Sequence, residues 1–327
     1  MSYNSKDLKE MARAVRAYAL HALRSAHSGH IGIVLGCADI ITTIYANWMR
    51  HGHDRFVLSA GHGSALLYAV LKLSGYDIGN LESFRKIGGL PGHPEYGIDG
   101  VDATTGPLGQ GIGNAVGMAL SEKINKTDSV VYCLCSDGDL MEGVASESIS
   151  FAGRYRLNNL VLLWADNGVS IDGVAQNDVD VAQRMMAAGW NVMSVDGDDF
   201  MRLNRALQNA KKSKLPVFIQ CKTQIGRGSS LVGSPKAHGF ALDDSELETL
   251  IRDNISEQGK QLWAGVASEN TETLLYKTES VVPNVVLPNV GDSISTRQLS
   301  GIYLNLLLGA GVKLVGGSAD LGGSTNT

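Results

Sequence analysis

The chain has 327 residues, of which 44% are apolar and 19% are charged. This composition is typical of a folded globular protein and excludes a disordered chain, and the length suits about two domains. The net charge of -5 provides no basic surface for nucleic acid. No apolar run approaches the roughly 20 residues that a membrane helix needs. We therefore expect a cytoplasmic protein that binds neither nucleic acid nor membrane.

The first predicted element is a helix that begins at a cap residue, either Asn4 or Ser5. Further along, short β-rich runs alternate with segments of helical length. These runs are VVYCLC (130–135), LVLLWA (160–165), NVMSV (191–195) and PVFIQCKT (216–223). Because they are continuously apolar, they predict strands buried on both faces, in an α/β fold with a parallel sheet and helices on both faces.

The C-terminal part predicts a change of domain. The segment KTESVVPNVVLPNVGD (277–292) contains two prolines and few helical signals, which is typical of a linker. After it, STRQLSGIYLNLLLGAG (295–311) predicts a capped helix and VKLVGG (312–317) a strand. We expect a first domain over 1–280, a linker over 281–292 and the start of an incomplete second α/β domain over 293–327.

The four cysteines follow neither a metal-binding spacing nor a disulfide framework. They are Cys37, Cys133, Cys135 and Cys221. Cys133 and Cys135 stand two apart in a predicted strand, so their side chains share one face. We expect buried free thiols.

Polar turns follow three of the predicted strands. DGDLMEG (137–143) follows the first, DNGVSID (166–172) the second and DGDD (196–199) the third. In parallel sheets of this kind, ligands bind beyond the carboxyl ends of the strands. We therefore expect a binding site at this edge of the sheet.

The first of these turns carries groups that suit a hard cation and a polyphosphate. Asp137 offers a carboxylate, Gly138 lets a phosphate approach the backbone, and a helix beginning near Leu140 would direct its positive end at the same anion. Asn167 stands at the end of the next strand, and its side-chain oxygen and the Val169 carbonyl would complete the protein ligands of Mg²⁺. For an Asp-Gly pair taken alone, an ordinary solvated turn is the alternative.

The order Asp-Gly, helix, apolar strand and Asp-Asn resembles the fingerprint of thiamine-diphosphate enzymes. Further motifs narrow this resemblance to the N-terminal half of the transketolase family, in the same order and at similar spacings. They are SGHIG (28–32), DRFVLSAGHGS (54–64), GLPGHPE (89–95), TTGPLGQGIGNAVGMA (104–119), SDGDLMEG (136–143), DNGVSIDG (166–173), CKTQIGRGS (221–229), AHG (237–239) and GGSADLGGS (316–324).

The resemblance implies thiamine diphosphate and Mg²⁺, or Ca²⁺, as cofactors. The implied cofactor contacts are His62, Gly106, Pro107, Leu108, Gly138, Asn167, His238 and Asp320, and the implied metal ligands are Asp137, Asn167 and Val169. The implied catalytic residues are the channel histidines His30, His93 and His238 and the proton-relay acid Glu142. Arg297 and Ser324 would bind the phosphate of the substrate.

The activity implied by the resemblance is transfer of a two-carbon glycolaldehyde unit from a ketose phosphate to an aldose phosphate, in the pentose phosphate pathway. The partners would be sugar phosphates and a second copy in a homodimer, or a partner that supplies the C-terminal half. The family's activating glutamate lies beyond Thr327, so we expect a truncated chain, inactive alone. The alternatives are a non-catalytic cofactor-binding fragment, a subunit of a split enzyme, and a related enzyme such as dihydroxyacetone synthase or deoxyxylulose-phosphate synthase.

Two motifs are expected to be structural. GQGIGNAVG (109–117) resembles a dinucleotide fingerprint, but Val116 stands where the last glycine is required and no clear strand precedes it. Its small residues instead favour a closely packed helix at a subunit interface. Asp198 replaces a histidine that is common in the family, and we expect its turn to be structural.

Overall fold

The structure is a computed structural model of the chain. It describes residues 2–175, 180–270, 293–316 and 322–325. The chain forms two compact units, Met1–Tyr276 and Lys277–Thr327. The predicted linker over 281–292 lies outside the described residues, and the predicted domain boundaries stay predictions.

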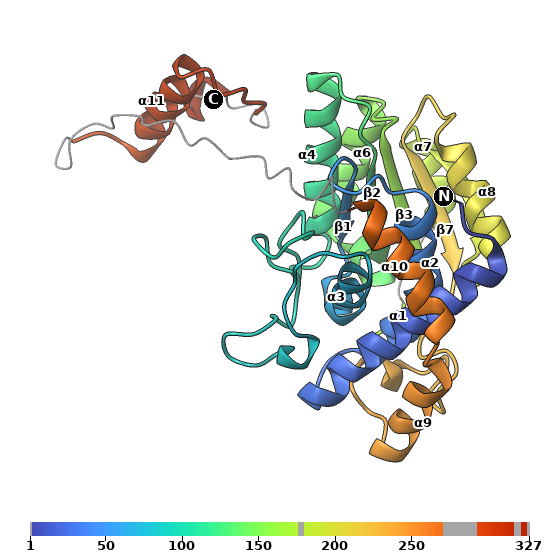
Figure 1. Cartoon of the computed structure of the whole chain (residues 1–327). Coiled ribbons are helices and arrows are strands. Elements are labelled where there is room, and N and C mark those ends of the chain that lie inside the picture. Colours follow the sequence, from blue (N-terminus) through green and yellow to red (C-terminus); the bar gives the residue numbers. More distant parts are fainter. Residues whose placement is uncertain (1, 176–179, 271–292, 317–321, 326–327) are drawn as a thin grey trace. The chain divides into compact units, whose positions relative to one another are not determined.

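The described residues of the first unit form a five-stranded parallel sheet in the order β1-β2-β3-β7-β6 (Figure 1). Its strands are β1 (Arg55–Leu58), β2 (Val131–Ser136), β3 (Leu160–Asp166), β6 (Asn191–Asp196) and β7 (Val217–Lys222). The central pair runs in register from Val131 opposite Leu160 to Ser136 opposite Ala165. Because the strands are parallel, the turns that follow β2 and β3 meet at one edge of the sheet.

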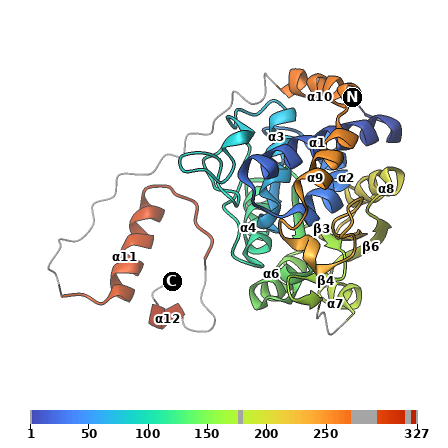
Figure 2. The same ribbon diagram turned by 90° about the horizontal axis from the view of Figure 1, so that it is seen from below.

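Helices cover both faces of this sheet, as the sequence predicts. Along β2 and β3 the side chains alternate, so that Leu134 and Leu163 enter one core while Cys133 and Leu162 enter the other. The first core contains α1 (Ser5–Ala26), α2 (Ile31–Asn47), α3 (Ser64–Leu73), α8 (Phe200–Ala210), α9 (Asp244–Asn254) and α10 (Glu257–Asn270). The second contains α4 (Gln110–Asn125), α5 (Asp137–Met141), α6 (Gly143–Arg154) and α7 (Val181–Ala187). Figure 2 shows α1, α2 and α9 on one side of the strands and α6 and α7 on the other.

The structure corrects the predicted burial of one strand and adds another. β6 lies at an edge of the sheet, so it is partly exposed and Ser194 faces solvent. β1, at the opposite edge, was missed as a strand because RFVL is too short to stand out as a periodic run. The predicted buried thiols are confirmed, since all four cysteines are free and buried.

Short elements complete the first unit. A two-stranded antiparallel hairpin joins β4 (Val169–Ser170) and β5 (Gly173–Val174). Single helical turns lie at Gly61–Gly63, Leu81–Ser83 and Pro235–His238. The first helix is capped by Asn4, whose side chain accepts hydrogen bonds from the backbone of Lys6 and Asp7, so the structure selects Asn4 over Ser5 as the cap.

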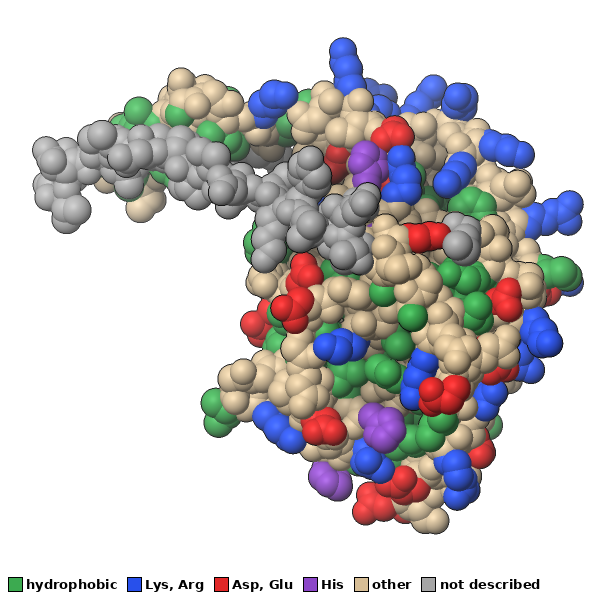
Figure 3. Space-filling model, viewed as in Figure 1, with side chains coloured by type: hydrophobic (Ala, Val, Ile, Leu, Met, Phe, Trp, Pro, Cys, Tyr) green, Lys and Arg blue, Asp and Glu red, His purple; other side chains and the backbone are tan. Residues whose placement is uncertain are grey.

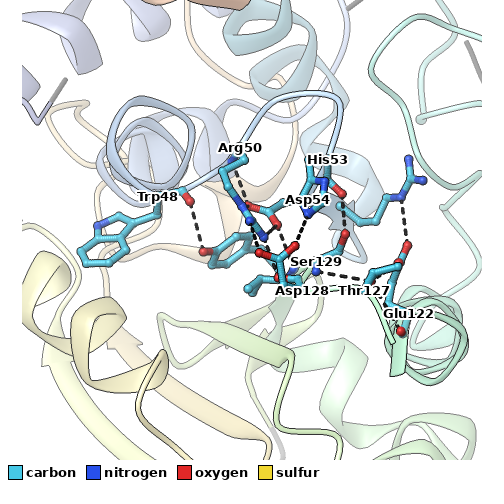
Figure 4. A network of polar contacts seen from close by, with 11 residues as sticks. Trp48, Arg50, His53, Asp54, Glu122, Thr127, Asp128 and Ser129 are labelled. Atoms are coloured by element: carbon cyan, nitrogen blue, oxygen red, sulfur yellow. Dashed lines mark hydrogen bonds and ion pairs between the residues drawn. The ribbon is translucent and has the colours of Figure 1, made fainter. Parts of the chain in front are cut away.

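A polar network closes the amino-terminal edge of β1 and β2 (Figure 4). Arg50 Nη2 lies 2.8 Å from Oδ1 of buried Asp54, and Nη1 lies 2.7 Å from Oδ2 of Asp128. The backbone N–H of Val130 also donates to Asp54, at 2.8 Å. A cavity of about 430 Å³ adjoins this network. Its basic side chains already have partners, since Lys123 donates to the carbonyl groups that end α6 and Lys211 lies over the Trp48 ring.

Charged side chains are unevenly spread over the surface. Figure 3 shows lysine and arginine side chains gathered along the right edge of the view, where Figure 1 places α8 and the start of α1. Among the described residues, no helix combines the length and apolarity needed to cross a bilayer.

The second unit contains α11 (Thr296–Gly309) and α12 (Gly322–Thr325). Ser295 and Gln298 form a capping box at the start of α11, which confirms the predicted capped helix. The predicted strand is wrong for residues 312–316, which form no strand. A strand needs a neighbour to satisfy its backbone, and the described residues of this unit contain no sheet with which it could pair.

Candidate functional site

A cavity of about 440 Å³ lies at the carboxyl ends of β2 and β3. Its wall is formed by strand ends, by the start of α2 and by loops that are distant in sequence. The residues that line it include His30, Ile33, Cys37, Gly61, His62, His93, Gly106, Leu108, Ser136, Gly138, Asn167, Val169, Ile225 and His238. The cavity lies at the edge of the sheet that the sequence predicts, and its size suits a small organic ligand.

The turn after β2 is fixed by Asp139. Its Oδ2 accepts hydrogen bonds from the backbone N–H and the hydroxyl of Ser136, at 2.9 and 3.0 Å. Its Oδ1 accepts from the Ser59 hydroxyl at 3.0 Å and from the Gly109 N–H at 2.8 Å. This fully buried carboxylate therefore joins the ends of β1 and β2 to the loop before α4. Sequence reasoning missed this role, although the Ser-x-x-Asp spacing of a helix cap was visible.

The same bonds correct the predicted start of the following helix. α5 begins at Asp137 and not near Leu140, because Ser136 and Asp139 cap it directly at the end of β2. The turn is thus shorter than the sequence suggested. Asp137 and Gly138 form its first helical residues and reach the cavity end of the strand.

Asp137 and Asn167 lie side by side at the ends of the two central strands. The backbone N–H of Asn167 donates to Asp137 Oδ2 at 3.3 Å, and the Val169 N–H donates to Asn167 Oδ1 at 3.0 Å. Burial raises the pKa of Asp137 to about 6, against the lowering effect of the Asn167 N–H, and nearby Asp166 raises it further. A cation at this carboxylate would remove the cost of charging it.

The oxygens at this point fit a hard divalent cation. The carboxylate, the Asn167 amide oxygen and the Val169 carbonyl are the ligand types that Mg²⁺ and Ca²⁺ take. The described part of the chain contains no group of three or more His, Cys, Asp or Glu arranged to hold a metal. An oxygen set with one carboxylate therefore fits better than a transition-metal site.

Gly138 faces the cavity without a packing reason for being glycine. A Cβ at this position would touch only Leu108, at 3.5 Å, which is ordinary contact. Gly61 differs, because a Cβ there would lie 2.7 Å from the Gly106 backbone nitrogen. Close packing thus explains Gly61, whereas Gly138 leaves room for a ligand to approach the start of α5.

Four histidines from separate segments meet in the cavity. The ring centroids of His62 and His238 are 4.9 Å apart, and His30 lies 5.3 Å from His62 and 5.2 Å from His238. His93 lies 6.3 Å from His30. The structure therefore brings together all four histidines that the sequence singled out.

The histidines are held in the neutral form. Burial, followed by neighbouring histidines, lowers the pKa of His62 to about 3 and that of His30 to about 4. Burial also lowers the pKa values of His93 and His238. At neutral pH each ring therefore has one donor and one acceptor nitrogen, which suits hydrogen bonding to hydroxyl groups and proton transfer.

Arg85 is a cation at this cluster that sequence reasoning missed. Its Nη2 lies 3.3 Å from His30 Nδ1, and its Nη1 donates to the Ser28 hydroxyl at 2.6 Å. Its positive charge adds to the lowering of the His30 and His93 pKa values after burial. No motif marks Arg85 in the sequence, because only the fold brings it to His30.

The remaining predicted residues lie in several places. Gly106 and Leu108 line the cavity, whereas Pro107 is exposed and is not part of its lining. Glu142 is half-buried at the start of α6, beside Gly109 and outside the lining.

Three predicted residues belong to the C-terminal part of the chain. Arg297 is exposed on α11 and Ser324 lies in α12, both in the second unit. Asp320 lies outside the described residues. The proposed roles of all three stay predictions.

Known proteins are similar to this chain in both sequence and fold. The family model for the transketolase thiamine diphosphate binding domain matches residues 8–260. A transketolase of Rhodobacter capsulatus is 45% identical over 240 residues, covering 66% of this chain and 36% of the relative. The structure of a Campylobacter jejuni transketolase has a TM-score of 0.84 and 34% identity, over 99% of this chain and 58% of that chain.

A transketolase of Pichia stipitis, solved in complex with sedoheptulose-7-phosphate, has a TM-score of 0.75 and 33% identity, over 98% of this chain and 57% of that chain. The chain thus spans 36% to 58% of the length of these relatives. The matched residues 8–260 contain the cavity and its four histidines. The chain therefore belongs to the transketolase family, and residues 8–260 correspond to the thiamine diphosphate binding domain of that family.

Proposed function

We propose that this chain binds thiamine diphosphate through Mg²⁺ or Ca²⁺ in the cavity at the ends of β2 and β3, as the cofactor-binding part of a transketolase. The observation that carries the proposal is the bond between buried Asp137 and Asn167 at the edge of a cavity that Asn167 and four neutral histidines line, in a transketolase-family domain. The complete enzyme would transfer a glycolaldehyde unit from a ketose phosphate to an aldose phosphate.

The residues at the strand ends are proposed to bind the diphosphate end of the cofactor. Asp137, the Asn167 amide and the Val169 carbonyl would hold the metal ion, and Gly138 at the start of α5 would let the diphosphate approach the backbone. His62 and His238 would donate to the diphosphate. Gly106, Pro107 and Leu108 would contact the aminopyrimidine.

When bound, thiamine diphosphate supplies an electron sink for the carbanion left by cleavage of a ketose beside its carbonyl group. His30, His93 and His238 would bind the sugar hydroxyls and move protons, which their lowered pKa values support. Arg297, Ser324 and Asp320 are proposed to contribute from the second unit. The Pichia stipitis complex with sedoheptulose-7-phosphate supports sugar phosphates as the substrate class.

A homodimer is part of this proposal. Several large apolar side chains near α4, α5 and α6 are exposed, namely Leu108, Met141, Val144, Phe151 and Tyr155. The Phe151 and Tyr155 rings lie 4.4 Å apart and together present an apolar surface. On α4, a Cβ at Gly117 would meet nothing within 4 Å. We propose that a second copy covers this surface and that Glu142, at its edge, acts in a proton relay between the copies.

The experiment that tests cofactor binding compares Asp137→Asn with Asp244→Asn, an exposed aspartate on α9 that serves as the matched control. Calorimetric titration of thiamine diphosphate with Mg²⁺ should give a dissociation constant at least about 100-fold weaker for Asp137→Asn, since a charged metal ligand is lost. The control should bind like the unmodified chain. Equal affinities in the two variants would refute the metal assignment.

Further measurements distinguish this proposal from a fragment that only binds cofactor and from related enzymes. A fragment that only binds cofactor would bind thiamine diphosphate but stay inactive when the C-terminal half is supplied as a separate chain. A panel with xylulose 5-phosphate, formaldehyde as acceptor, and pyruvate with glyceraldehyde 3-phosphate would separate transketolase from dihydroxyacetone synthase and deoxyxylulose-phosphate synthase. The proposed cytoplasmic location is tested by cell fractionation.

A further inference from the structure

The loop between β7 and α9, residues 223–243, lies against the first turns of α2 and carries two residues of the cavity wall, Ile225 and His238. A Cβ on Gly32 would lie 2.4 Å from Ile225 Cγ1, and one on Gly36 would lie 2.9 Å from the Gln224 carbonyl oxygen. Glycines at both positions let the loop approach α2 this closely. Any displacement of the loop would therefore move Ile225 and His238 within the cavity wall.

Backbone hydrogen bonds fasten this loop to α2 at two points. The Gly226 N–H donates to the Gly32 carbonyl at 3.2 Å, and the Ile31 N–H donates to the Gly239 carbonyl, also at 3.2 Å. Both bonds are at the long end of the usual range. Side chains of the loop add a further link.

Arg227 provides an ionic link from this loop to two other elements. Its Nη1 donates to Asp39 Oδ2 on α2 at 2.8 Å. The same nitrogen lies 2.6 Å from Asp198 Oδ1 in the turn between β6 and α8, an ion pair without hydrogen-bond geometry. The other Asp39 oxygen accepts from Arg16 on α1, at 2.8 Å. One guanidinium thus joins the loop, α2 and the β6–α8 turn.

Because its carboxylates are largely buried, this ionic link is expected to contribute more free energy than an ordinary surface ion pair. The side chain of Asp39 is 5% exposed and that of Asp198 is 21% exposed, whereas Arg227 is 39% exposed and borders a groove. Removing the guanidinium would leave two carboxylates close together, and among the described residues Arg16 would remain as the cation paired with Asp39. The ion pair with Arg227 gives the turn at Asp198 a structural contact, in line with the structural role expected for it.

The link acts on the far side of α2 from the cavity. Ile33 and Cys37, four residues apart, line the cavity, while Leu35 and Asp39, also four residues apart, border the groove of the ionic network. We propose that Arg227 is a positioning residue, which ties the 223–243 loop to α2 and to the β6–α8 turn and so holds Ile225 and His238 in the cavity wall. This inference rests on the proposed cofactor function of that cavity.

Amide hydrogen exchange tests the link in the unmodified chain and in three variants. Arg227→Met keeps the stem but removes the charge, and Arg227→Lys keeps one charge. Arg202→Met is the control, because Arg202 also pairs with a carboxylate beside this turn, at 3.3 Å from Asp199. Among the described residues, its side chain makes no hydrogen bond or ion pair with the loop. Exchange at residues 224–233 should be roughly tenfold faster in Arg227→Met, the effect of one charged hydrogen bond in a partly exposed site.

Arg227→Lys should restore part of the protection, and exchange in β2 and β3 should be unchanged in every variant. The inference is overturned if Arg227→Met exchanges like Arg202→Met. It is also overturned if the lysine variant behaves like the methionine variant, because the charge would then not be the cause.

A second arm of the experiment separates this inference from the proposed function. Thiamine diphosphate with Mg²⁺ should slow exchange in the loop of the unmodified chain, since binding stabilises the conformation that holds Ile225 and His238 in the cavity wall. Protection of the β2 and β3 ends without protection of the loop would overturn the positioning role. If the cofactor protects no segment, the proposed function fails, while the comparison of the Arg227 variants still decides whether the ionic link holds the loop.

Discussion

The turn after β2 carries two acids, Asp137 and Asp139, for which the structure predicts opposite effects of the same substitution. Asp139 accepts two hydrogen bonds on each carboxylate oxygen. In Asp139→Asn, one oxygen becomes an amino group that faces two donors. Two hydrogen bonds are lost, and at the lower end of roughly 1.5–3 kcal/mol for each bond to a charged group we expect the free energy of unfolding to fall by about 3 kcal/mol. This corresponds to a melting temperature lower by roughly 6–12 °C.

Asp137→Asn should instead stabilise the cofactor-free protein at pH 7. Burial raises the folded pKa of Asp137 to about 6, above the unfolded value of about 3.9. A carboxyl group whose pKa is raised by folding opposes folding at any pH above its unfolded value, and the cost is largest above the folded pKa. Removing the charge should therefore add about 1–3 kcal/mol at pH 7. The gain should shrink at pH 5, where the carboxyl group is mostly protonated in the folded protein.

Urea unfolding at pH 7 and pH 5, followed by circular dichroism, measures both effects, with Asp244→Asn as the exposed control. The predicted result at pH 7 is a lower midpoint for Asp139→Asn and a higher one for Asp137→Asn. Equal shifts in the same direction would refute the division of this turn into one structural acid and one site acid. A gain for Asp137→Asn that is as large at pH 5 as at pH 7 would refute the electrostatic cause.

Three further predictions concern other parts of the first unit. Folding lowers the pKa of His62 to about 3 and that of His30 to about 4. Below about pH 6.5 the unfolded chain therefore binds more protons than the folded chain, so acid favours unfolding. The midpoint of urea unfolding should fall between pH 7.5 and pH 5, and it should fall less in His62→Gln. Gly153→Ala should destabilise strongly, since its Cβ would lie 1.7 Å from a backbone oxygen. In the monomeric chain, Gly117→Ala should add about 0.5–1 kcal/mol to the unfolding free energy by helix propensity, since its Cβ would meet nothing within 4 Å. Thermal melts of both variants, at concentrations where the chain is monomeric, check this. Arg50→Ala should lower the free energy of unfolding, measured in urea, by about 1–2 kcal/mol, because it removes the ion pair with Asp54. The loss is limited because the Arg50 side chain is 44% exposed. The affinity for thiamine diphosphate should be unchanged.

The sequence predicts the central part of the sheet well, for a physical reason. β2, β3 and the first half of β7 are covered on both faces, and each is a largely apolar run. The edge strand β6 carries a weaker pattern because only part of its surface is buried, whereas β1 is largely buried but too short to form a periodic run. The strand predicted over 312–317 shows the same limit in its described residues, 312–316, since an apolar run specifies a strand only when a neighbour is present to pair with it.

The chemistry at the strand ends was likewise visible in the sequence, but its geometry was not. Asp137 and Asn167 follow strands directly, so topology alone places them together. His30 and His93 come from segments without sheet neighbours, and only the motif resemblance pointed to them. Arg85 acts through a contact between distant segments, which no local pattern encodes. For Asp139, the Ser136 cap has a local spacing, but the bond to Gly109 does not.

The central claim is that a metal ion and the diphosphate of thiamine diphosphate share the site between Asp137, Asn167 and Val169. The most direct measurement is the anomalous diffraction of crystals grown with thiamine diphosphate and Mn²⁺, which takes the same oxygen ligands as Mg²⁺. The account predicts a peak roughly 2–2.5 Å from the Asp137 carboxylate, the Asn167 amide oxygen and the Val169 carbonyl. Bound cofactor with the peak elsewhere, or with no peak at these three oxygens, would contradict it.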